Sequence, residues 1–119
     1  MATSKPLVLV VEDESLLREV AAGYLQEHGF DVLQARNADE AVTLLQVRGR
    51  VGAVFSDIQM PGSMNGLGLA HWISGAVPDV KVLLTSGRIR RGVAPEWPLL
   101  AKPYDMADVE RRLRAMVAG

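Results

Sequence analysis

The chain has 119 residues and a formal net charge of −1, from 13 basic and 14 acidic residues, with no cysteine. This length suits one compact domain, so we expect a single domain over residues 1–119, with residues 1–5 flexible. The balanced charge gives no pull toward nucleic acid, and the lack of cysteine excludes disulfides, thiol nucleophiles and thiolate metal sites.

The first quarter of the chain predicts a strand, a helix and a second strand. Residues 7–11 form a valine-rich run that is too short for a helix and apolar on both faces, as in a central parallel strand. Apolar residues then recur at helical spacing over residues 16–25, and Gly29 ends this helix. Residues 30–35 predict the next strand.

The middle of the chain repeats the same alternation. Asn37, with Glu40 three residues later, predicts the start of a second helix. Residues 51–56 form a third apolar strand, and a loop dense in turn-forming residues follows over residues 60–66. Residues 67–74 predict a third helix, because their apolar residues lie on one side.

The last part of the chain predicts two further strands and a helix. Residues 80–84 form a fourth strand that runs into two hydroxyl residues, and residues 98–101 predict a short fifth strand. Asp105 is placed to cap a final amphipathic helix. About five alternations of strand and helix predict an α/β fold, a single doubly wound, flavodoxin-like domain with a five-stranded parallel sheet.

Polar residues follow four of the predicted strands at the point where each strand ends. If the strand order is 2-1-3-4-5, strands one and three flank the switch point, where ligands bind in open α/β sheets. These two strands carry the acids, so we expect three carboxylates to converge, with a lysine and a hydroxyl nearby. The residues are Glu12 and Asp13, Asp57, the pair Thr85 and Ser86, and Lys102.

Three carboxylates in one pocket repel one another unless a cation neutralises them. Hard oxygen ligands with room for water suit Mg²⁺, and no histidine or cysteine nearby points to zinc. Mg²⁺ and a lysine can neutralise a phosphoryl group while an aspartate attacks it. Each residue also has an ordinary interpretation: Asp13 or Ser15 can cap the next helix, and Asp57 and Lys102 can be solvated loop residues.

Four motifs in this order resemble the receiver domain of response regulators, and the resemblance covers nearly the whole chain. It implies that Asp57 is the phosphoacceptor, charged by a sensor histidine kinase or a phosphotransfer protein. It also implies that Glu12, Asp13 and Asp57 hold Mg²⁺ together with the backbone carbonyl of Gln59. The motifs are LVVEDE at residues 9–14, DIQMPG at 57–62, LLTSG at 83–87 and KPYD at 102–105.

The same resemblance gives roles to residues of the last two motifs. It implies that Lys102 contacts the phosphoryl oxygens and that Pro103 follows a cis peptide bond, which is tolerated before proline. The family places a switching hydroxyl just before a small residue. Ser86, followed by Gly87, fits that position better than Thr85 does.

The sequence departs from the family pattern in three places. The loop after Asp57 carries an extra residue before Gly66, and the stretch from Ser86 to Lys102 is short by roughly one to two helical turns. The fourth helix of the family is therefore predicted to be short or missing. Leu99 stands where the family often has an aromatic residue. We expect activation through Ser86 and a remodelled 87–98 segment, without rotation of an aromatic side chain.

The main hypothesis is a stand-alone signalling switch, not a metabolic enzyme, that controls an unknown protein target through Mg²⁺-dependent phosphorylation. The alternative is a docking module on the same fold that works without phosphorylation. A phosphohydrolase is disfavoured because position 59 is glutamine instead of a second acid, and a flavin or dinucleotide site because three acids follow the first strand. We expect no direct nucleic-acid or membrane partner, since no apolar run reaches the roughly 20 residues of a bilayer span, and a cytoplasmic location.

Overall fold

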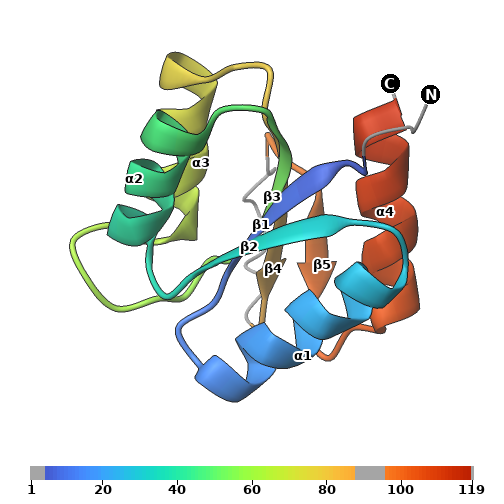
Figure 1. The fold of residues 1–119 in the computed structure, drawn as a ribbon. Coiled ribbons are helices and arrows are strands. Elements are labelled where there is room, and N and C mark those ends of the chain that lie inside the picture. Colours follow the sequence, from blue (N-terminus) through green and yellow to red (C-terminus); the bar gives the residue numbers. More distant parts are fainter. Residues whose placement is uncertain (1–4, 88–95, 119) are drawn as a thin grey trace.

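The computed structural model describes residues 5–87 and 96–118 and contains one sheet of parallel strands between two layers of helices. The strand order is β2-β1-β3-β4-β5, which confirms the predicted α/β fold and order 2-1-3-4-5. Figure 1 shows the sheet with the helices on its two sides. In chain order the elements are β1 Leu7–Val11, α1 Ser15–Glu27, β2 Asp31–Ala35, α2 Ala38–Arg48, β3 Val51–Asp57, α3 Gly66–Ala76, β4 Lys81–Ser86, β5 Leu99–Ala101 and α4 Met106–Ala118.

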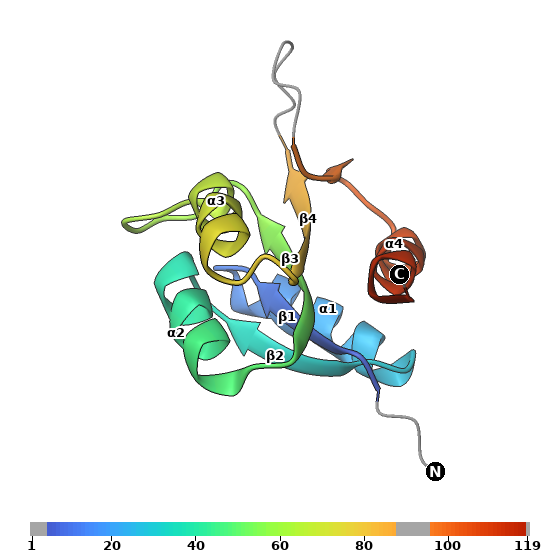
Figure 2. The same ribbon diagram turned by 90° about the horizontal axis from the view of Figure 1, so that it is seen from above.

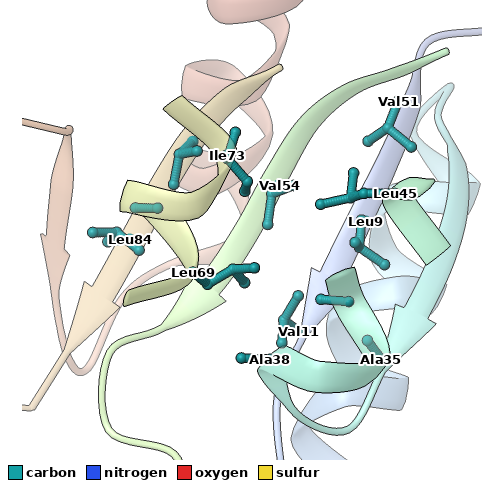
Figure 3. Close-up of a cluster of buried hydrophobic side chains, with 13 residues drawn as sticks. Leu9, Val11, Ala35, Ala38, Leu45, Val51, Val54, Leu69, Ile73 and Leu84 are labelled. Carbon is teal, nitrogen blue, oxygen red and sulfur yellow. The ribbon is translucent and has the colours of Figure 1, made fainter. Parts of the chain in front are cut away.

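The helices divide the core into two halves, one on each face of the sheet. α2 and α3 cover one face and α1 and α4 cover the other, as Figure 2 shows from above. Strand residues alternate between the two halves: Leu9 and Val11 lie in the first cluster, and Val8 and Val10 lie in the second. This alternation explains why the central strand is apolar on both faces. Figure 3 shows the α2/α3 half of the core.

The caps of the helices agree with the sequence prediction in part. The Asn37 side chain accepts a hydrogen bond from the backbone N–H of Glu40 at 2.8 Å, and Asp105 accepts one from Ala107, so both predicted caps are confirmed. The alternative interpretation, in which Asp13 or Ser15 caps α1, does not apply, because Glu14 occupies the N-cap position and makes no side-chain hydrogen bond there. Asn65 caps α3, which starts one residue before the predicted helix.

The fourth strand is longer at its end than the sequence predicted. β4 continues through Thr85 and Ser86, because the backbone carbonyl of each residue accepts a hydrogen bond from a neighbouring segment of the chain. Thr85 O accepts from Ile58 N at 2.9 Å, and Ser86 O accepts from Lys102 N at 2.9 Å. These two bonds bring the ends of β3, β4 and β5 into line.

Between β4 and β5, the described positions 87 and 96–98 contain no helix. The expected remodelling of segment 87–98 concerns mainly residues 88–95, and these, like residues 1–4 of the predicted flexible start, lie outside the described part. Trp97 packs against the α2/α3 half of the core, with its ring edge-to-face with His71 of α3 at 4.7 Å. An aromatic side chain therefore covers part of the sheet beside α3. Among the helices described, none is long and apolar enough to cross a membrane.

Candidate functional site

The acids that end β1 and β3 converge at the edge of the sheet where the parallel strands end, which we call the carboxyl edge. One carboxylate oxygen from each of Glu12, Asp13 and Asp57 lies within 4.8 Å of the other two. Glu12 and Asp57 are 7% and 5% exposed, while Asp13 is exposed. The predicted cluster therefore forms, with two buried acids and one acid exposed to solvent.

The end of β5 supplies the cation of the site. The Lys102 ammonium donates to Asp57 Oδ2 at 2.8 Å, and it lies 3.9 Å from Glu12 Oε1. The peptide bond between Lys102 and Pro103 is cis, as the resemblance implied. Lys102 thus belongs mainly to Asp57, and Glu12 is its more distant partner.

The cluster shifts the pKa values of Glu12 and Lys102 for different reasons. Burial, with further contributions from a hydrogen bond with the Asp13 side chain and the charge of Asp57, raises the pKa of Glu12 to about 7. Burial alone would lower the pKa of Lys102, but the hydrogen bond and charge of Asp57 raise it above its ordinary value. Lys102 is therefore positively charged at neutral pH, whereas Glu12 is only partly ionised near pH 7.

Gln59 and Ser86 form a second layer around Asp57. The backbone N–H of Gln59 donates to Asp57 Oδ1 at 3.2 Å, so the two oxygens of Asp57 have different partners. The side-chain oxygen of Gln59 accepts a hydrogen bond from the Ser86 hydroxyl at 3.0 Å. The Thr85 hydroxyl is buried and has no hydrogen-bond partner among the described residues. The two hydroxyls named in the sequence are thus in different surroundings.

Two residues support the site although the sequence indicated no role for them there: Arg18 was not named, and Gly66 was named only as a loop position. Arg18 of α1 donates to the backbone carbonyl of Glu12 at 2.8 Å and so holds the end of β1. Gly66 lies against the end of β3, where an added Cβ would meet Asp57 O at 2.2 Å. The turn-rich composition of the loop was visible in the sequence, but this close approach joins positions that only folding brings together.

The donor set fits a hard divalent cation. Glu12 Oε2 is buried without a hydrogen-bond partner among the described residues, although buried carboxylate oxygens are normally bonded. Together with Asp13 and Asp57 it offers carboxylate oxygens only, which suits Mg²⁺. The acidic cluster is therefore consistent with a Mg²⁺ site.

Comparison with known proteins gives one consistent result. The family model of the response regulator receiver domain matches residues 8–114. The chain is 38% identical over 87 residues to the transcriptional regulatory protein AruR of Pseudomonas aeruginosa, across 70% of its own length. It is 30% identical over 117 residues, 92% of its length, to the sensor kinase CckA of Brucella abortus.

A similar solved structure is the response regulator TrrA of Thermotoga maritima in complex with Mg²⁺ and BeF. It is 28% identical, with a TM-score of 0.83, and the match covers 93% of this chain and 98% of that one. The curated relatives are longer than the matched region: the chain spans 35% of the length of AruR and 12% of the length of CckA.

Proposed function

Because the chain belongs to the response regulator receiver domain family, we propose that it is a phosphorylation switch in which Asp57 accepts a phosphoryl group. Receiver domains are signalling switches and not metabolic enzymes. The observation that carries the proposal is the contact of 2.8 Å between Lys102 Nζ and Asp57 Oδ2 inside the acid cluster. A buried aspartate with a cation beside it is poised to attack an anionic phosphoryl group.

The residues of the carboxyl edge divide the chemistry between them. Asp57 supplies the carboxylate oxygen that bonds to phosphorus while the bond between phosphorus and the phosphodonor breaks, and the donor group leaves with the electrons of that bond. Lys102 neutralises the phosphoryl oxygens during this transfer. Glu12, Asp13, Asp57 and the backbone carbonyl of Gln59 would hold Mg²⁺. When bound, Mg²⁺ supplies charge neutralisation for the phosphoryl group and for the three acids.

We assign the switching hydroxyl to Ser86 in preference to Thr85. Ser86 is linked to the Asp57 carboxylate through both arms of Gln59, by bonds of 3.0 Å and 3.2 Å. Phosphorylation adds about −1.5 to −2 charges and strong acceptor oxygens at Asp57. A nearby hydroxyl can donate a hydrogen bond to one of these oxygens. The new hydrogen bond of Ser86 would change the conformation of the surface around the ends of β4 and β5.

The proposed phosphodonor is a sensor histidine kinase or a histidine phosphotransfer protein. The names of two relatives, the sensor kinase CckA and histidine kinase 3 of Arabidopsis thaliana, support this kind of partner. The output of the switch would be contact with another protein, since the chain carries 13 basic and 14 acidic residues and has no cationic excess for nucleic acid. We propose a cytoplasmic location for the protein.

Acetyl phosphate with Mg²⁺ tests the proposal on the isolated chain. The wild-type protein should gain the mass of one phosphoryl group, and the Asp57→Asn variant should gain none. Asp79→Asn is the matched control, because it makes the same chemical change at an exposed position before β4. Incorporation into Asp57→Asn would contradict the assignment, and no incorporation into the wild type would favour the phosphorylation-independent docking module.

A further inference from the structure

The side chain of Gln59 contacts Ser86, and the proposed function gives this side chain no part in the switching step itself. Its side-chain oxygen accepts from the Ser86 hydroxyl at 3.0 Å, while its backbone N–H donates to Asp57 at 3.2 Å. Gln59 is exposed and Ser86 is fully buried. One exposed side chain therefore holds the buried hydroxyl that is assigned to the switch.

The hydroxyl of a serine carries one proton and donates one hydrogen bond at a time. In the structure described above, Ser86 donates to Gln59. Phosphoryl oxygens on Asp57 would be charged and therefore stronger acceptors than a neutral amide. Ser86 can donate to them only if its bond to Gln59 breaks.

The two partners differ in what happens after the bond breaks. The Gln59 side chain is exposed, so water can take over its hydrogen bonds at once. The Ser86 hydroxyl is buried, so its proton needs a new acceptor within the protein or on the phosphoryl group. Breaking the bond therefore costs Gln59 little, and Ser86 loses it without penalty only when another acceptor, such as a phosphoryl oxygen, is present.

We propose that Gln59 is a positioning residue, a latch that holds the Ser86 hydroxyl in the unphosphorylated protein and competes with the phosphoryl group for it. The inference rests on the proposed function of Asp57 and Ser86. The latch opposes the phosphorylated arrangement, so its removal should make a phosphoryl group bind more tightly. This effect acts through the Ser86 hydroxyl and should vanish when that hydroxyl is absent.

Calorimetric titration with beryllium fluoride in the presence of Mg²⁺ measures this competition, with beryllium fluoride standing in for the phosphoryl group. Gln59→Met keeps the backbone N–H and the side-chain length but loses the amide. We expect it to bind roughly threefold to tenfold more tightly than wild type, the size of one ordinary hydrogen bond. Gln59→Asn keeps the amide on a shorter side chain and should show the same direction, which separates the lost contact from the apolar surface of methionine.

The Ser86→Ala background makes the test specific to the latch. Gln59→Met should change the affinity in the wild-type background and leave it unchanged in Ser86→Ala, a non-additivity that a general effect on the loop would not produce. Gln46→Met, on an exposed position of α2, is the matched control and should bind like wild type.

Two results would overturn the latch while leaving the proposed function intact. One is an unchanged affinity in Gln59→Met, and the other is an equal change in both backgrounds. A wild-type protein that binds no beryllium fluoride with Mg²⁺ would overturn the proposed function, and the latch with it.

Discussion

The two edges of the sheet use charge in opposite ways. At the carboxyl edge, Glu12 and Asp57 are buried and Lys102 lies between them. At the other edge, where the strands begin, charged residues rim an open cavity of about 630 Å³. The charged residues that line this cavity at the amino edge are Lys5, Asp31, Arg48 and Arg50, and all four are exposed.

The difference between the two edges shows which charges cost the folded state free energy. Exposed charges are solvated and change stability little, whereas buried acids cost free energy unless they are paired or neutralised. Lys102 pairs well with Asp57 but lies 3.9 Å from Glu12, so Glu12 remains incompletely compensated. Among the described residues, the two buried charged side chains both lie at the carboxyl edge, so substitutions at the two edges should differ in the size of their effect.

The largest expected effect is at Gly66, beside the end of β3. Gly66→Ala would place a Cβ at 2.2 Å from Asp57 O and 2.8 Å from Ile58 Cα, so the backbone must move. We expect a loss of about 3 kcal/mol or more in the free energy of unfolding, measured with urea. Gly75→Ala in the same helix meets nothing within 4 Å and should be neutral or stabilise by up to about 1 kcal/mol. Similar losses in both variants would contradict the close approach at β3.

Glu12 should make stability depend on pH. Its pKa is raised from 4.5 to about 7, so between these values the folded protein holds a proton that the unfolded chain releases. The free energy of unfolding of the wild type should therefore fall, relative to Glu12→Gln, as the pH rises from 4.5 to about 7. With screening by water at the mouth of the site, we expect a change of roughly 1–2 kcal/mol.

Urea titrations at several pH values measure that difference. Asp31→Asn provides the comparison from the amino edge, where the carboxylate is exposed, and should change stability by less than about 0.5 kcal/mol. A flat difference between wild type and Glu12→Gln across the same pH range would show that Glu12 is fully compensated.

The affinity for Mg²⁺ should depend on the same ionisation of Glu12. A carboxylate must be ionised to bind the cation, so the affinity of the wild type for Mg²⁺ should rise with pH through about 7, where Glu12 is half ionised, and level off about one pH unit higher. Glu12→Gln should bind about tenfold more weakly, or about 1.4 kcal/mol, with a flatter pH profile. Calorimetric titration measures both, and an unchanged affinity in Glu12→Gln would remove Glu12 from the ligand set.

The smallest effects are expected at the amino edge. Arg50 has a φ of 60°, in the left-handed region that favours glycine. Arg50→Gly should raise the free energy of unfolding by about 0.5 kcal/mol, whereas Arg48→Gly, at the last residue of α2, should lower it by about 0.5–1 kcal/mol. Neither should alter phosphoryl incorporation from acetyl phosphate. A loss of incorporation in either variant would mean that the two edges are coupled.

Local patterns in the sequence determined the order of the elements and the residues at the strand ends. Short runs that are apolar on both faces, such as residues 7–11, are typical of buried parallel strands, and the caps at Asn37 and Asp105 depend on neighbours two or three residues away. Since parallel strands end at one edge, the convergence of Glu12, Asp13 and Asp57 followed from the strand order. The resemblance to the receiver family added the cis bond before Pro103.

Only the tertiary structure decided which partner each polar group takes. Lys102 pairs more closely with Asp57 than with Glu12 across 45 residues, Ser86 donates to Gln59 across 27 residues, and Gly66 is pressed against the end of β3. These contacts depend on differences of about an ångström between elements that are distant in sequence. A pattern of residue types carries no such distance, because side-chain positions are set by packing in the whole fold.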